Sequence, residues 1–220
     1  LNLSTIAAQS NSYGGYFISL HSNGANNSAN YVISEYCGTR SSNSTEKVSG
    51  SKKFAYTAAV QHDKNRLTDV TYSTPRAIND YAFNGWNLGV LRTNTQVGYL
   101  VESWFHDYRP ETLRMKGDAY NRYLAWQLAR AYMEYPKGNA SGIKGCVVGD
   151  IRNTSKGCGY SKYTHRNRDS YLAVNGAKVE LINSSGTVVQ TMTTDNWHNG
   201  VYAFFDVAAG SYTVRVSKSG

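Results

Sequence analysis

Two short apolar stretches each end on a side chain that could take part in catalysis. Residues 16–21 read Tyr-Phe-Ile-Ser-Leu-His, and residues 98–102 read Gly-Tyr-Leu-Val-Glu. Such runs are typical of buried strands in a parallel sheet. His21 and Glu102 are therefore expected at C-terminal strand ends, where open α/β sheets hold their sites. An imidazole can ligate zinc, and a carboxylate can act as general base for a metal-bound water. The pair predicts a zinc hydrolase.

The other histidines carry weaker signals. His106 lies four residues beyond Glu102 and could contact a substrate, whereas three histidines without a partner pattern are expected at the surface: His62, His165 and His198. A lone imidazole at a strand end is often structural, and a carboxylate there can simply face water. The shared position of His21 and Glu102 at one sheet edge favours a site instead.

The elements that position this pair alternate between strand and helix up to residue 136. This alternation is typical of an α/β domain with a mostly parallel sheet and flanking helices. We expect the end of a helix around residues 5–8, closed by a turn over 10–15. A strand is expected over 31–36, and Ser51 is suited to cap the helix that follows.

The rest of this region is less regular. The mixed segment 66–84 predicts a long loop, and residues 86–91 predict another extended element. Pro110 suits the first turn of a short helix. A longer helix follows and is stopped at Pro136. Its apolar face recurs at helical spacing and consists of Leu124, Leu128, Ala131 and Tyr135.

Composition changes after residue 136, where short strands with turn signals replace the helices. Five strands are expected: 147–148, 177–182, 188–192, 201–205 and 212–216. Asn199-Gly200 predicts a tight hairpin. We therefore predict an α/β domain over residues 1–136, a linker over 137–142 and a small all-β sandwich over 143–220. The sandwich has no His, Asp and Glu cluster, so its expected role is binding, spacing or attachment.

The net charge of the 220-residue chain is +8, divided evenly between residues 1–140 and 141–220 at +4 each. Diffuse positive charge suits a polyanionic partner such as a cell wall, or simple solubility. Because no basic stripe with interleaved aromatic residues occurs, nucleic acid is not expected as a partner. The 18 tyrosines, against 6 phenylalanines, suit either a surface that stacks on sugars or ordinary β-strands.

Membrane and disulfide signals are few. No run approaches the roughly 20 apolar residues of a membrane span, and no signal-peptide pattern is visible. The three cysteines form no Cys-x-x-Cys pair of the kind that holds structural zinc. Cys146 and Cys158 are close enough in sequence to close a short loop as a disulfide, or they remain reduced. If Cys146 and Cys158 form this disulfide, Cys37 has no cysteine to pair with.

Three motifs occur in a fixed order along the chain: Phe-Ile-Ser-Leu-His-Ser-Asn-Gly over residues 17–24, Leu-Gly-Val-Leu-Arg over 88–92, and Leu-Val-Glu over 100–102 with Phe105 shortly after. This ordered set resembles the zinc-dependent N-acetylmuramoyl-L-alanine amidases of the amidase-3 type. The C-terminal part resembles the carboxypeptidase-regulatory-like or transthyretin-like β-sandwich, through residues 176–179 and 209–214.

The resemblance implies a peptidoglycan hydrolase. Amidases of this type cleave the amide between N-acetylmuramic acid and L-alanine of the stem peptide. By resemblance, His21 is one zinc ligand and Glu102 is the catalytic glutamate, so Zn²⁺ is the implied cofactor. Glu102 would accept the proton of the attacking water and pass it to the leaving amine.

The same resemblance has two departures. The family's other zinc ligands, a histidine after its first strand and a glutamate on the next helix, have no counterpart here, and a catalytic zinc normally takes three protein ligands. The chain is expected either to begin inside the fold of a longer protein or to be a degenerate member. The family also tends to place Gly between Glu102 and Phe105, where this chain has Ser103-Trp104. The Trp is expected to change the substrate cleft.

The resulting interpretation is a secreted, periplasmic or cell-envelope protein that acts on peptidoglycan or its muropeptides. The alternative is a non-catalytic cell-wall-binding or scaffold protein with a degenerate amidase fold. A third hypothesis is a zinc peptidase of another type. Asn87 and Arg92 could contact the glycan or the stem peptide, or could be a loop residue and a strand-end charge.

Overall fold

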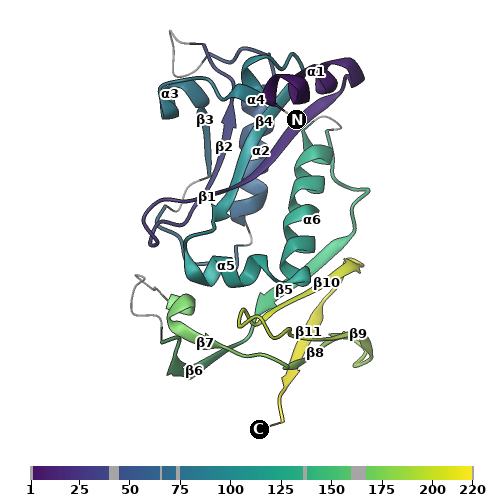
Figure 1. Ribbon diagram of the computed structural model, residues 1–220. Helices are drawn as coiled ribbons and strands as arrows, with labels where there is room; N and C mark the ends of the chain where they lie inside the picture. The colour runs from purple at the N-terminus through teal and green to yellow at the C-terminus, as the bar shows by residue number, and fades with distance from the viewer. Residues whose placement is uncertain are drawn as a thin grey trace.

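The protein consists of a mixed α/β part, from helix α1 to helix α6, and an all-β part that begins with strand β5 (Figure 1). The computed structural model describes residues 2–39, 45–64, 66–72, 75–135, 138–159 and 167–219. This arrangement confirms the predicted class, an α/β sheet with flanking helices and a separate small all-β region. The exact domain boundaries stay a prediction.

The sheet of the α/β part has four strands in the order β1-β4-β2-β3. These are β1 (Tyr16–Asn23), β4 (Val97–Phe105), β2 (Val32–Tyr36) and β3 (Arg76–Asn79). β1 is parallel to β4 and β2 is parallel to β3, whereas β2 and β4 are antiparallel. The sheet is thus mostly parallel, as predicted. The expectation that β1 is buried was wrong, because β1 is an edge strand whose residues are exposed or half-buried.

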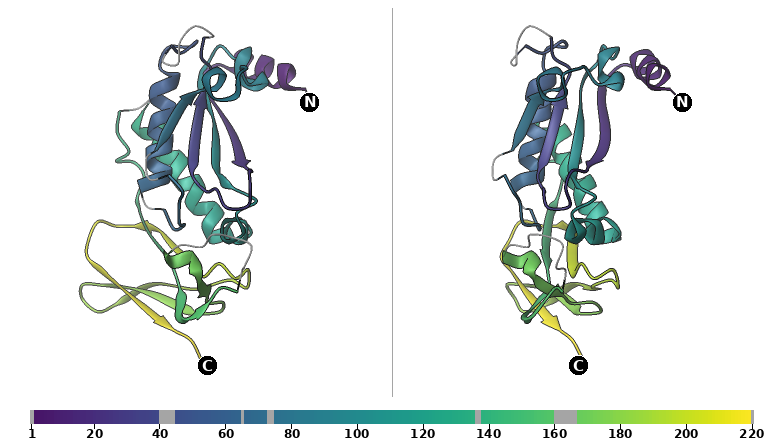
Figure 2. Two further views of the ribbon diagram at one scale, coloured as in Figure 1. Left: turned by 90° about the vertical axis from the view of Figure 1, so that its left-hand side faces the viewer. Right: turned by 60° about the vertical axis from the view of Figure 1, so that its left-hand side comes forward.

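Helices α2 (Ser51–Lys64) and α6 (Asp118–Glu134) cover one face of this sheet (Figure 2). Small and aromatic side chains let them pack closely, with Phe54 of α2 against Tyr99 of β4 at a ring separation of 4.7 Å. The predicted apolar face of α6 is only partly correct. Ala131 is buried, but the fully packed face also includes polar and aromatic residues: Tyr120, Tyr123 and Gln127.

The start of α2 differs from the prediction that Ser51 caps it. Ser51 is the first helical residue, and its hydroxyl accepts a hydrogen bond from the Gly98 amide at 3.1 Å. The carboxylate of Glu46 instead accepts the amides of Gly50 and Lys52 at the helix N-terminus. A carboxylate suits this place because the helix dipole is positive there.

The remaining elements of the α/β part are short. α1 (Leu3–Tyr13) and α4 (Gly89–Arg92) pack together beyond the N-terminal end of β1, and α5 (Arg109–Met115) precedes α6. The helix predicted to end near residue 8 runs to Tyr13, where Gly14 ends it with a positive φ of 73°. Two predictions were wrong. The segment 66–84 contains β3 and α3 (Asp80–Asn84), and residues 89–91 are helical.

The all-β part contains a two-stranded sheet (β10-β5), a three-stranded sheet (β11-β8-β9) and a small pair (β6-β7). All five predicted strands are confirmed, as β5 (Gly145–Asp150), β8 (Lys178–Asn183), β9 (Val188–Thr193), β10 (Val201–Val207) and β11 (Tyr212–Ser217). The sequence did not predict β6 (Arg152–Gly157), the 3-10 helix η1 (Asn167–Ser170) or β7 (Tyr171–Ala173).

The predicted hairpin at Asn199-Gly200 does not form, because β10 pairs with β5 and not with β9. Gly200 has a φ of 67°, and its Cα lies against Ile151, where an added Cβ would be 2.4 Å from the carbonyl oxygen. Asn199 is buried, and its side chain accepts a hydrogen bond from the Val201 amide. The pair therefore places β10 into its sheet without making a hairpin.

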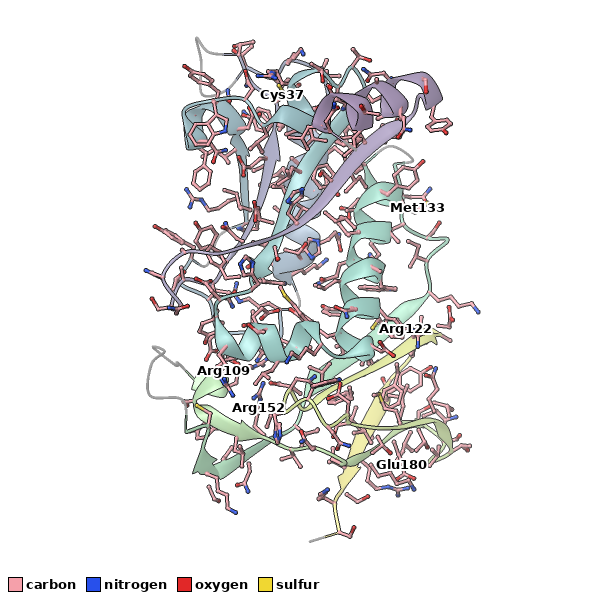
Figure 3. All side chains as sticks on the ribbon, in the orientation of Figure 1. Cys37, Arg109, Arg122, Met133, Arg152 and Glu180 are labelled. Carbon is pink, nitrogen blue, oxygen red and sulfur yellow. The ribbon has the colours of Figure 1, made fainter. Side chains whose placement is uncertain are left out.

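A buried ionic cluster joins the two parts. Arg114 of α5 is fully buried and forms ion pairs with Glu111 at 3.2 Å and with Asp169 of η1. Asp150 of β5 lies 3.9 Å from the same guanidinium. Arg152, seen at this junction in Figure 3, pairs with Asp150 at 2.7 Å. These contacts bury charges from both parts, so the β part is docked on α5.

The cysteines form no cross-link. Cys37, Cys146 and Cys158 are all free, so the expected alternative of a Cys146–Cys158 disulfide is not realised. Cys146 lies on β5 and is half-buried, and burial raises the pKa of its thiol to about 12. Cys37 is buried in the apolar cluster below α4, where burial raises its pKa to about 11.

Candidate functional site

The parallel pairing of β1 and β4 places His21 directly beside Glu102 in register. Alternation along β1 decides which face they occupy. Tyr16 points toward α2 and α6, since its ring lies 5.7 Å from the ring of Phe54. Residues an odd number of positions away, including His21, point to the opposite face. His21 is exposed, and its Nε2 is 3.1 Å from the hydroxyl of Ser19.

Glu102 is half-buried between two histidines. Burial raises the pKa of its carboxyl above the ordinary value, and electrostatic interaction with the nearby His21 and His106 side chains acts in the opposite direction. A carboxylate held in this way can exchange a proton closer to neutral pH than an exposed glutamate. The structure therefore gathers three residues singled out in the sequence: His21, Glu102 and His106.

His106 is fixed beside the end of β1. Its Nδ1 is 3.1 Å from the Ser22 hydroxyl, and its amide donates to the carbonyl of Asn23 at 2.8 Å. A Cβ on Gly24 would lie only 2.8 Å from His106 Nε2, so the glycine leaves room for the ring. Substrate contact by His106 stays a prediction.

The backbone directly after Glu102 is strained. The register between β1 and β4 shifts beyond the His21–Glu102 pair, so β4 bulges there. Within the bulge Trp104 has a φ of 102°, a region that favours glycine. Its ring is buried at 1 % exposure, and no described residue accepts a hydrogen bond from the indole Nε1. Strained non-glycine residues of this kind cluster at functional sites.

Glu35 of β2 is a second carboxylate on the same face, and sequence reasoning missed it. Ile33 lies opposite Glu102, so Glu35, two residues further along, shares its face. Its carboxylate accepts a hydrogen bond from the side-chain amide of Asn84 at 2.6 Å. Burial raises the pKa of Glu35 to about 7, a shift that Asn84 opposes and Glu102 reinforces. The signal available was an acidic residue inside an apolar strand.

Aromatic side chains border this face next to Arg76 of β3, which continues the row of Glu102 and Ile33. The guanidinium of Arg76 lies over the rings of Tyr72 at 5.0 Å and Tyr31 at 5.5 Å. Cation–π contacts of this type hold the arginine side chain in place.

Other residues named in the sequence lie away from this site. Asn87 donates hydrogen bonds to the carbonyl of Gly38 and to Asp80, which supports the alternative that it is a structural loop residue. Arg92 ends α4, near the start of β4 and away from Glu102. His198 is exposed as expected, but His62 is fully buried, so its prediction was wrong. His165 lies outside the described residues.

The residues present do not form a complete zinc site. Within the described ranges, no group of three or more His, Cys, Asp and Glu side chains is arranged to hold a metal ion. His21 is the only histidine from the resemblance, and its described hydrogen-bond partner is Ser19. Since a catalytic zinc takes three protein ligands, His21 could supply one of them and no more.

A cavity of about 560 Å³ opens beside the C-terminal end of β1. Leu20 and Ser22, which alternate to the α6 face of β1, line it on one side together with the intervening His21, and Leu124 and Leu128 of α6 line it on the other. Leu20 is 62 % exposed. Its apolar wall with a few polar groups is typical of ligand sites.

Comparison with known proteins gives one match for the β part. Residues 165–220 match a family model described as the SdrD B-like domain. No curated protein matches the sequence of the chain. The β part is thus similar to a β domain of that description, and its resemblance to transthyretin-like sandwiches stays a prediction.

The solved structures similar to this chain include N-acetylmuramoyl-L-alanine amidases. Ami1, an N-acetylmuramyl-L-alanine amidase from Mycobacterium abscessus, matches with a TM-score of 0.50 and 17% identity over 60% of this chain and 60% of its own. Cwp6 from Clostridium difficile matches with a TM-score of 0.50 and 21% identity over 62% of this chain and 20% of its own. An N-acetylmuramoyl-L-alanine amidase from Clostridium difficile 630 has a TM-score of 0.49 and 20% identity over 64% of this chain and 68% of its own. At these identities the likeness concerns the fold alone: the chain contains a fold shared with an N-acetylmuramyl-L-alanine amidase.

Proposed function

We propose that this chain is part of a peptidoglycan hydrolase that cleaves the amide between N-acetylmuramic acid and L-alanine of the stem peptide. The observation that carries the proposal is the pairing of His21 with Glu102 near the C-terminal ends of adjacent parallel strands. This pairing occurs in a fold shared with an N-acetylmuramyl-L-alanine amidase. The Leu-Val-Glu motif at residues 100–102 supports the assignment of Glu102.

In this proposal Glu102 is the general base. Its carboxylate accepts a proton from the water that attacks the amide carbonyl and returns that proton to the departing amine. Its raised pKa favours holding the proton between the two steps. The proposal also has His106 contact the substrate beside Glu102, and its hydrogen bond with Ser22 supports this role.

We propose Zn²⁺ as the cofactor, with His21 as one ligand. When bound, zinc polarises a carbonyl and lowers the pKa of water. Because the described residues provide no set of three ligands, the other ligands have to lie outside them. The mechanism above therefore depends only on Glu102 and its neighbours.

The proposed location is secreted, periplasmic or associated with the cell envelope, where peptidoglycan is the substrate. The positive net charge of +8 is consistent with an anionic wall. No helix among the residues that the structure describes is long and apolar enough to cross a membrane.

The proposal is tested with a version of the protein that carries additional upstream sequence, beside the chain itself. Zinc content is measured by elemental analysis, and muropeptide products are identified by mass spectrometry. We expect the longer version to bind about one zinc per chain and to release intact stem peptides. Peptides without muramic acid serve as the control substrate. If they are cleaved equally well, the protein is a zinc peptidase of another type.

The second candidate is a non-catalytic wall-binding or scaffold protein, and the lack of a three-ligand group among the described residues favours it. Co-sedimentation with purified peptidoglycan, without any release of stem peptide or zinc uptake by the longer version, would support this candidate. That result would overturn the hydrolase.

A further inference from the structure

A groove follows the junction between α6 and the β part, away from Glu102. It consists of two neighbouring cavities, of about 260 Å³ and about 560 Å³. Both are lined by Asp118 and Ala119 of α6 and by Met192 of β9, so they adjoin each other. Figure 3 shows Arg122, which lines the larger cavity, at this junction.

Trp197 forms an exposed wall at one end of the groove. Its side chain is 50 % exposed, and the Lys116 ammonium lies over its ring at 5.1 Å. The turn that carries it is held firmly. The Trp197 amide donates to Asp195 at 2.9 Å, and the His198 amide donates to Asn175 at 3.0 Å. The indole is therefore presented on a rigid turn, which lowers the entropy that a ligand must overcome.

The other end of the groove has a second aromatic ring. Phe205 of β10 lies there with the Arg122 guanidinium 4.5 Å from its ring centroid. Two non-glycine residues with positive φ flank the groove, His198 at 57° and Asp206 at 58°. Backbone strain of this kind is maintained where the surrounding structure fixes a particular shape.

The charges of the groove are mixed. Lys116 and Arg122 lie beside three carboxylates, Asp118, Asp195 and Asp206, which leaves only one net negative charge. A polyanion would find no positive field here, and a cationic ligand would find no consistent negative one. The groove thus offers aromatic faces together with hydrogen-bonding groups and little net charge, which suits an uncharged polyhydroxylated ligand.

We propose that this groove binds a glycan strand. The apolar face of a pyranose ring can stack on Trp197, and its hydroxyl groups can bond to the carboxylates and side-chain hydroxyls of the walls. Two adjoining cavities suit more than one sugar ring. This site lies outside the proposed cleavage site, so it extends the proposed function and does not depend on it.

The test is titration of the full chain with N-acetylglucosamine oligomers of two to six units, followed by calorimetry. We expect affinity to increase with oligomer length. Trp197→Ala should weaken binding about tenfold or more, while Trp197→Phe retains most of it. The matched control is Trp86→Ala, because Trp86 is 62 % exposed but lies in the α/β part. Binding by this variant should equal that of the parent chain.

Three results would overturn the glycan site: no oligomer binds, Trp197→Ala binds as the parent does, or Trp86→Ala loses as much affinity as Trp197→Ala. Thermal melting of each variant confirms that it is folded. The titration measures binding without any cleavage of an amide bond, and Glu102 lines neither cavity. Failure of oligomer binding therefore overturns only the groove, and failure of stem-peptide release overturns only the cleavage site.

Discussion

Glu102 is the residue on which the proposed chemistry depends, and its surroundings set the pH range in which it can act. Burial raises the pKa of its carboxyl, and a general base has to be deprotonated before it accepts a proton. Amide cleavage by the longer version should therefore increase as the pH rises through this raised pKa. Glu102→Gln should lower the rate about 100-fold or more, measured by muropeptide release.

Glu180→Gln is a suitable control for that experiment. Glu180 lies in the β part, where Arg215 and Lys178 lower the pKa of its carboxyl to about 2. Its loss should leave the rate and its pH dependence unchanged. A Glu102→Gln variant as active as the parent would contradict the role of general base.

Glu35 should make stability depend on pH. Its folded-state pKa is about 7, above the ordinary 4.5, so the folded state retains its proton more strongly than the unfolded state does. The stabilising contribution is full below pH 4.5 and is lost as the pH rises through 7. Glu35→Gln should flatten the dependence of the free energy of unfolding between these values, measured by urea denaturation. An unchanged slope would contradict a raised pKa.

The sequence predicted these residues unequally. His21 and Glu102 could be found because each ends an apolar run, and residues on neighbouring parallel strands come together at one edge. Glu35 could not, because its importance depends on the antiparallel pairing of β2 with β4. His62 looked like a surface residue, but it is buried against Gln127, where burial lowers its pKa to about 4.

At the scale of elements, the bulge in β4 makes an unusual prediction. Trp104 has a φ of 102°, where a Cβ is unfavourable. Replacing it by Ala or Gly removes the same buried ring, at a cost of about 3–5 kcal/mol. The Gly variant should nevertheless be more stable than the Ala variant by about 1 kcal/mol, the reverse of their order in an ordinary strand. Urea denaturation of both variants measures the difference.

The control for this comparison is Tyr99, which is also buried in β4 but is not among the residues with positive φ. Tyr99→Ala should be more stable than Tyr99→Gly by about 0.5–1 kcal/mol. If Trp104→Ala is also more stable than Trp104→Gly, the left-handed backbone conformation of Trp104 is not a source of strain.

Long elements were predictable and short ones were not. α6 and the five predicted strands of the β part have six or more residues each, and β6, with six, is the exception that was not predicted. α3 and α4, with five and four residues, depend on distant partners. The Asp80 carboxylate accepts the amides of Gly38 and Leu88, which fixes this region through tertiary contacts. Propensity over so few residues cannot reveal such contacts.

At the scale of the whole molecule, the ionic cluster around Arg114 should make the two parts unfold together. Arg114→Met leaves Glu111 and Asp169 buried without their partner, which should destabilise the protein by about 3–5 kcal/mol. Calorimetry of the parent chain should show one transition. Arg215→Met removes the pair between the exposed Arg215 and Glu180, which keeps its second partner Lys178, and should change the melting temperature little.

Two separate transitions in the parent chain would contradict this coupling. The sequence indicated two parts but not their docking, because Arg114, Asp150 and Asp169 are far apart in the chain and individually resemble surface charges.

The three free cysteines have a consequence for where the protein can fold. No covalent cross-link contributes to its stability, and the Cys37 and Cys146 thiols have pKa values far above neutral. These two sulfurs remain protonated, and so they react slowly with oxidants and exchange partners. The native state therefore needs no disulfide, and its melting temperature should be the same with and without a reducing agent.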